Sequence, residues 1–121
     1  MFVGLVNGEV LVYDLQNLEF SHYSIRVETI FECDKRSKRV TDIKCHPDKM
    51  HRLAIVFENT GVAVYSINKD RAIYTIHLSA DKDFHKGKAL AVEWYSDTEL
   101  IVGFSSGTLE LYDTTRVGSK P

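Results

Sequence analysis

The segment VGFSSGTLELYD, residues 102–113, is the third copy of a pattern found earlier as VGLVNGEVLVYD, residues 3–14, and IVFENTGVAVYS, residues 55–66. In each copy an apolar run leads into a short turn containing Gly, and a second, alternating run ends on Tyr followed by Asp or Ser. Alternation with a period of two predicts strands, and Asn or Ser near Gly between two such runs predicts a tight turn. Each copy therefore predicts one β-hairpin.

Further strand signals flank the second hairpin and complete a unit of four strands. The predicted strands are Val40–Cys45, Leu53–Phe57, Val62–Ile67 and Ala72–Leu78. Pro47 ends the first of them, because proline cannot donate a ladder hydrogen bond. Residues 89–95, ALAVEWY, hold the same place before the third hairpin. The repeat length of about 50 residues is typical of four-stranded propeller blades.

The strand count predicts an all-β chain of about two and a half four-stranded antiparallel blades, arranged as an open arc of an incomplete ring. We expect a partial blade over residues 1–33, a complete blade over 40–78 and a partial blade over 89–114, joined by loops at 34–39 and 79–88. A propeller needs about four blades to close. The chain is therefore expected to be a fragment of a longer protein. The alternative is self-assembly of several copies into a ring, but the two partial blades would then duplicate strands and fit poorly.

Composition indicates a soluble globular domain, with 44% hydrophobic residues, 26% charged residues and a net charge of −2. No apolar run approaches the ~20 residues that a membrane helix needs, and no export signal precedes the first strand. Cys33 and Cys45 are too few for a disulfide framework and are expected to be free thiols in a reducing compartment. We expect a cytoplasmic location without a transmembrane segment.

The hairpins that end on Tyr13-Asp14, Tyr65-Ser66 and Tyr112-Asp113, with the strand that closes on His46-Pro47-Asp48, resemble WD repeats over nearly the whole chain. The set is divergent, because Tyr replaces the usual Trp. Asn7, Asn59 and Ser106 stand where the typical turn has Asp.

The buried polar tetrad of WD repeats cannot be carried over to this sequence. His85 lies before the third inner strand and is the candidate for the histidine of the Gly-His pair. Its context, Phe84-His85-Lys86-Gly87, does not match that motif.

Within this class the chain looks like the early blades of the lethal giant larvae and tomosyn family. The matching positions are Gly4-Leu5, Gly8, Tyr13-Asp14, Val40, Ile43 and His46-Pro47. The resemblance implies a cytoplasmic scaffold that binds syntaxin-type SNARE proteins and regulates vesicle trafficking, exocytosis or cell polarity. The alternatives are a WD-repeat scaffold in RNA processing, nuclear transport or ubiquitin targeting, and, more remotely, part of a propeller enzyme.

Catalytic and metal-binding patterns are not evident in the sequence. Cys33, Cys45, His46 and His51 lack the short Cys-x-x-Cys spacing of zinc sites. No nucleophile elbow, phosphate-binding glycine loop or zinc-protease helix motif occurs. We therefore expect no enzyme activity, no metal and no cofactor.

A basic cluster stands immediately before the inner strand of the complete blade. It consists of Lys35, Arg36, Lys38 and Arg39. Clustered cations attract phosphates or acidic segments, so the loop is a candidate contact for an anionic partner or for a membrane surface at the periphery. Ser37 within it is a conceivable phosphorylation site. The interpretation that the sequence favours is a solvated connector, and nuclear targeting or nucleic-acid contact is the third alternative. Nucleic acid is not expected, because the net charge is acidic.

Two aromatic residues, Trp94 and Tyr95, end the inner strand before the third hairpin. Trp and Tyr are enriched at binding hot spots, so this pair is the candidate for a protein-partner contact. Core packing is the interpretation that the sequence favours for both.

Overall fold

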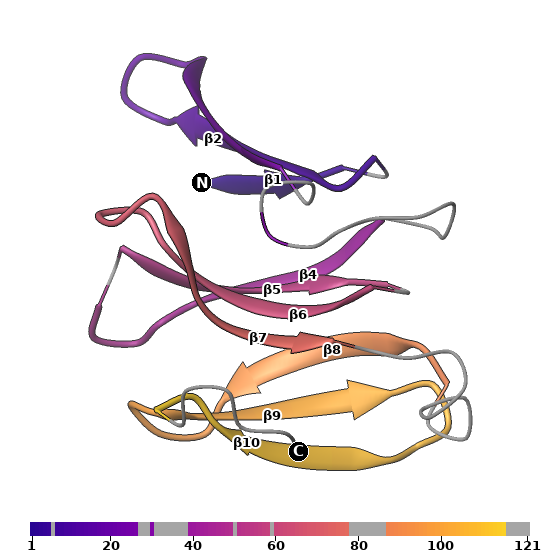
Figure 1. Cartoon of the computed structure of the whole chain (residues 1–121). Helices are drawn as coiled ribbons and strands as arrows, with labels where there is room; N and C mark the ends of the chain where they lie inside the picture. Colours follow the sequence, from indigo (N-terminus) through magenta and orange to yellow (C-terminus); the bar gives the residue numbers. More distant parts are fainter. Residues whose placement is uncertain are drawn as a thin grey trace.

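The computed structural model describes residues 1–5, 7–26, 30, 39–49, 51–58, 60–77 and 87–115. In these residues ten strands form three antiparallel sheets that stack one on another, and no helix occurs (Figure 1). This confirms the all-β class predicted from the repeated hairpins. No helix that could cross a membrane is present in the same residues.

The three sheets follow the chain in order. The first sheet contains β1 (Phe2–Gly4), β2 (Glu9–Asp14) and β3 (Glu19–Arg26). The second contains β4 (Val40–Cys45), β5 (Arg52–Phe57), β6 (Gly61–Ser66) and β7 (Arg71–His77). The third contains β8 (Ala89–Trp94), β9 (Glu99–Phe104) and β10 (Leu109–Asp113). Within each sheet, every strand pairs with the strands that precede and follow it in sequence.

The repeated turns have the backbone conformation that their glycines permit. Gly8 and Gly107 have φ values of 87° and 89°, in the left-handed region that only glycine enters without strain. Asn7 helps to close its turn, because its Oδ1 accepts a hydrogen bond from the Glu9 amide at 3.1 Å. The predicted hairpins are confirmed as the pairs β1–β2, β5–β6 and β9–β10.

Irregularities in the ladders recur at matching places in different sheets. The pairing of β4 with β5 shifts between Val40 and Asp42, and that of β8 with β9 shifts between Ala89 and Ala91. A second pair of shifts precedes the repeated tyrosines, at Leu11/Tyr13 in the first sheet and Val64/Tyr65 in the second. Since β-bulges bend and twist a strand at a defined point, the sheets share their shape as well as their strand order.

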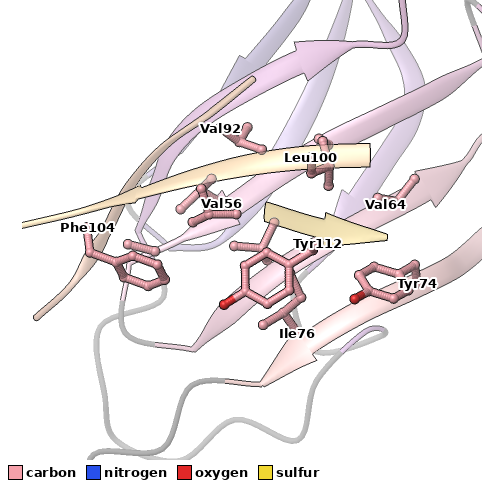
Figure 2. Close-up of a cluster of buried hydrophobic side chains, with 12 residues drawn as sticks. Val56, Val64, Tyr74, Ile76, Val92, Leu100, Phe104 and Tyr112 are labelled. Carbon is pink, nitrogen blue, oxygen red and sulfur yellow. The ribbon is translucent and has the colours of Figure 1, made fainter. Parts of the chain in front are cut away.

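The second sheet is buried on both faces. Leu53, Ile55, Phe57, Ala63 and Tyr65 pack with Val10 and Ile25 of the first sheet. Ala54, Val56, Val62 and Val64 pack with Val92, Leu100, Val102, Phe104 and Tyr112 of the third sheet, where Figure 2 shows labelled side chains of both sheets meeting. Full burial of an aliphatic side chain is worth about 1.5–3 kcal/mol. This two-sided burial explains the unbroken apolar runs LAIVF and GVAVY in β5 and β6.

The first and third sheets each contain three strands among the described residues. The first begins with the strand that is second in the complete sheet, and the third ends with the strand that is third. Leu109 and Leu111 on β10 alternate with Tyr112, which packs against the second sheet, so they lie on the opposite face of the third sheet and are 72% and 53% exposed. The open sheets confirm the partial propeller expected from the strand count.

The first two sheets come together closely at a glycine. A Cβ placed on Gly4 of β1 would lie 2.7 Å from the Val40 Cβ and closer still to its Cγ1. At the same point the Val40 amide donates to the Leu5 carbonyl at 3.1 Å. Gly4 is thus required by space, because no side chain fits between β1 and β4.

Candidate interaction surface

The ends of β4 and β8 form a corner that joins the second and third sheets. Its first component is His46, which follows β4 and is only 2% exposed. The Asp48 and Lys49 amides donate to its Nδ1 at 3.1 and 3.0 Å. Because Nδ1 accepts, the proton is on Nε2, which donates to the Asp97 carbonyl at 2.7 Å. The imidazole therefore stabilises the turn that follows β4 and links that turn to the turn after β8 by a hydrogen bond.

Trp94 is the second component of this corner. Its indole N–H donates to the Lys44 carbonyl at 3.2 Å, and its ring meets the His46 ring edge to face with centroids 4.6 Å apart. Trp94 is only partly exposed and packs against the apolar cluster between the second and third sheets. Its side chain is therefore engaged mainly within the fold.

Tyr95, the next residue, projects from this anchored strand end. It is 65% exposed, and its amide donates to the Glu99 carbonyl at 2.9 Å. We call the exposed residues beside it the corner surface; they are Pro47, Asp48, Lys49, Tyr95, Asp97 and Thr98. The predicted aromatic pair thus divides, with Trp94 held in the fold and Tyr95 presented to solvent.

The basic cluster is described only at its last residue. Lys35, Arg36 and Lys38 lie outside the described residues, as do Ser37, Cys33 and His85. Arg39 is exposed, and its carbonyl accepts a hydrogen bond from the Glu58 amide at 2.8 Å. The C-terminal end of the cluster is thereby attached to the end of β5.

Of the residues considered as metal ligands, Cys33 lies outside the described residues, and the others have other partners or lie apart. Both ring nitrogens of His46 are engaged with the backbone, as described above. Cys45 is exposed at the end of β4. Within the described ranges, no group of three or more His, Cys, Asp or Glu residues is placed to hold a metal ion.

A charged tie that sequence reasoning missed links the innermost strands β4 and β8. Asp42 accepts the Ile43 amide through Oδ1 at 2.9 Å and the Val92 amide through Oδ2 at 3.0 Å. The Lys44 ammonium lies 3.5 Å from carboxylate oxygens of both Asp42 and Glu93. These carboxylates, Asp42 foremost, raise the pKa of Lys44. Since the lysine is well solvated, the ion pairs add little stability, and the backbone hydrogen bond is the specific link.

A second missed cluster ties the first sheet to the second. The phenols of Tyr23 on β3 and Tyr65 on β6 both donate to Oδ1 of Asp70 at 2.8 Å. These hydrogen bonds, first from Tyr65 and then from Tyr23, lower the pKa of the Asp70 carboxyl. Burial, followed by the hydrogen bonds, raises the pKa of Tyr23 well above its ordinary value, and burial also raises the pKa of Tyr65.

The sequence indicates only those hydrogen bonds of the corner and of the two clusters whose partners are close along the chain. The amides that His46 accepts lie two and three positions ahead, in the His-Pro-Asp turn, and Tyr65 precedes its Asp70 partner by five positions. The partners Asp97, Val92 and Tyr23 are 51, 50 and 47 positions away from His46, Asp42 and Asp70. Only the stacking of the sheets brings them together.

Comparison with known proteins identifies the fold. No family model matches the chain, and no curated protein does. Among solved structures, the crystal structure of the Cps50 (Swd1) β-propeller domain from Myceliophteria thermophila superposes with a TM-score of 0.71 at 14% sequence identity. The match covers 95% of this chain and 31% of that one. The chain therefore has the fold of consecutive blades of a β-propeller and spans about a third of the length of this structural relative.

Proposed function

We propose that the chain is part of a noncatalytic, cytoplasmic protein-interaction scaffold that docks a syntaxin-type SNARE protein in vesicle trafficking, exocytosis or cell polarity. The β-propeller fold supports the general role, because its stacked sheets hold exposed turns in fixed positions. The resemblance of the Tyr-ended hairpins and of His46-Pro47 to the lethal giant larvae and tomosyn family supports the class of partner.

The observation that carries the proposal is the contrast between Trp94 and Tyr95. Trp94 and His46 anchor the corner from both sheets, so Tyr95 is exposed on a rigid base. A preorganised aromatic side chain loses little conformational entropy when a partner covers it, and tyrosine is enriched among hot spots. Docking on the corner surface requires no reaction chemistry.

The basic cluster supplies a second, weaker contact in this proposal. Lys35, Arg36, Lys38 and Arg39 place four cations within five residues. Each Lys or Arg held close to an anionic membrane contributes about 1 kcal/mol. The cluster would thus attract acidic partner segments and hold the scaffold at the membrane periphery.

Calorimetric titration with the cytoplasmic region of a syntaxin-type SNARE tests the proposal. Tyr95→Ser is expected to weaken binding by about thirtyfold, the effect of a hot spot of about 2 kcal/mol. Phe20→Ala is the matched control, because Phe20 is an exposed aromatic on β3, in another sheet. Absence of binding, or equal loss in both variants, would overturn the proposed docking.

A further inference from the structure

Arg52, the first residue of β5, carries a polar group that the described part of the fold leaves without a partner. Its Nε is buried, and no described residue accepts a hydrogen bond from it. The ion pairs among the described residues do not include its guanidinium either. Arginine is rarely buried without an acceptor, because a charged donor then loses its hydration with no compensating bond. Arg52 therefore retains hydrogen-bonding capacity that the described fold does not use.

The register of the second sheet places the Arg52 side chain. Side chains alternate between the two faces of a strand, and Ala54 and Val56 of β5 pack against the third sheet. Arg52 shares their face, so its stem enters the seam between the second and third sheets. Its cross-strand neighbour Ser66 is only 2% exposed, and the Ser66 hydroxyl accepts the Lys69 amide at 3.3 Å. The β6 side of this seam is therefore closed.

This end of the seam is the corner that His46 and Trp94 hold together. The Arg52 amide donates to the Lys49 carbonyl at 3.0 Å, and the Arg52 carbonyl accepts the His46 amide at 2.9 Å. The backbone of Arg52 thus closes the turn between β4 and β5, which belongs to the corner surface. His46 also bonds the Asp97 carbonyl across the same seam. Arg52 therefore adjoins the surface from which Tyr95 projects.

Charge and shape select the kind of group that suits Arg52. The residue is half-buried, so its guanidinium can be reached from solvent at the corner. The corner surface carries the exposed side chains of Asp48, Lys49 and Asp97, and Arg52 makes this set neutral. A carboxylate adds one negative charge, whereas a phosphate adds about two beside two acidic side chains. The planar guanidinium fork also matches a carboxylate. Both features favour a carboxylate.

We propose that Arg52 receives the carboxylate of an Asp or Glu side chain of the docked partner, beside the residue that covers Tyr95. The guanidinium then gains an acceptor, and the partner gains a charge-assisted hydrogen bond. Because the fold has already buried part of the arginine, binding has less of this group left to desolvate and to order. The inference rests on the proposed docking at the corner surface and adds the chemistry that the partner must present there.

The Nε–H resonance of Arg52 in a nitrogen–proton correlation spectrum reports on this group directly, and its loss in Arg52→Lys assigns it. The probe is N-acetyl-glutamate N-methylamide. Its matched control is the glutamine analogue, which has the same length and no charge. The resonance is expected to shift saturably with the glutamate compound and to stay in place with the glutamine compound. Inorganic phosphate, as a second oxyanion, is expected to bind more weakly than the carboxylate.

Calorimetric titration with the cytoplasmic region of a syntaxin-type SNARE tests the same group in the complex. Arg52→Met keeps an apolar stem and removes the charge. It is expected to weaken binding about tenfold or more, the effect of losing a charge-assisted hydrogen bond. Arg26→Met is the matched control, because Arg26 pairs with Glu9 at the end of β3 in the first sheet. This control is expected to bind as the parent chain does.

The inference is overturned if the glutamate compound leaves the Arg52 resonance unmoved or if the glutamine compound moves it equally, since water alone then serves the guanidinium. It is also overturned if phosphate binds more tightly than the carboxylate. SNARE binding that depends on Tyr95 but is equal in Arg52→Met and the parent would refute this inference alone. A carboxylate-dependent shift without SNARE binding would refute the proposed partner alone. If Arg52→Met does not fold, the glutamate titration of the parent chain still decides.

Discussion

The ring of Trp94 meets the ring of His46 at a centroid distance of 4.6 Å and an interplanar angle of 65°. One residue belongs to the third sheet and the other follows the last residue of β4 in the second. The His46–Asp97 hydrogen bond adds a polar link between the same two sheets. This corner positions the exposed Tyr95, so the stability of the fold and the proposed binding depend on the same residues.

Replacing His46 by Ala should destabilise the chain by about 2–3 kcal/mol. The change leaves the Asp48 and Lys49 amides and the Asp97 carbonyl without their partner and removes a ring from the Trp94 contact. Urea unfolding followed by the fluorescence of the single tryptophan measures it. A decrease of less than about 0.5 kcal/mol in the free energy of unfolding would show that the His46 contacts do not stabilise the fold.

Acid should remove the contribution of Asp70 to the attachment between the first and second sheets. The pKa of Asp70 is lower in the folded chain than its ordinary value. Its contribution is therefore complete above the ordinary value and is lost as pH falls through the lowered folded value. Urea midpoints from about pH 7 to about pH 2 should fall less steeply for Asp70→Asn than for the parent chain. If the urea midpoints of the two chains changed in parallel with pH, the hydrogen bonds of Asp70 with Tyr23 and Tyr65 would not contribute to stability.

Alkali should act on the phenols of the same cluster. The pKa of Tyr23 is raised in the folded chain above the ordinary value of 10.0, so its contribution is complete below that value and is lost as pH rises above it. Tyr23→Phe cannot ionise. Between about pH 8 and 11 the parent should lose more stability than Tyr23→Phe, and a constant difference across this range would be evidence against the raised pKa.

Gly4→Ala should destabilise the chain by about 1–3 kcal/mol, because the new Cβ overlaps Val40 where β1 approaches β4. Gly103→Ala is the matched control. Its added Cβ would meet the Leu109 Cδ2 at 3.4 Å, an ordinary contact within the third sheet. Chemical unfolding of both variants should separate them, and equal stabilities would argue against close contact between the first two sheets.

Leu111→Lys should reduce self-association of the chain with little effect on its stability. Leu111 is 53% exposed on β10, a strand at the edge of its sheet in the described structure. A lysine on such an edge opposes pairing with another chain. Sedimentation velocity measures the change. If Leu111→Lys left self-association unaltered, the surface responsible for self-association would not be the β10 edge.

The sequence predicted the strands well because their determinants are local. The observed β4 matches the predicted Val40–Cys45, and β5 begins one residue before the predicted Leu53. The buried role of His46 was not predicted, because its packing depends on Trp94 and Asp97 in the next sheet. Alternation alone also could not predict that Trp94 packs within the fold while Tyr95 is exposed, since both residues end the same apolar run.

A backbone NMR titration of the chain with the cytoplasmic region of a syntaxin-type SNARE is the decisive experiment for the corner surface. We expect the largest chemical-shift changes at the amides of Lys49, Tyr95 and Asp97 on the corner surface, and we expect these changes to be lost in Tyr95→Ser. Saturating binding that leaves these amides unchanged, or no binding at all, would contradict the claim that this corner is the docking surface of a propeller scaffold.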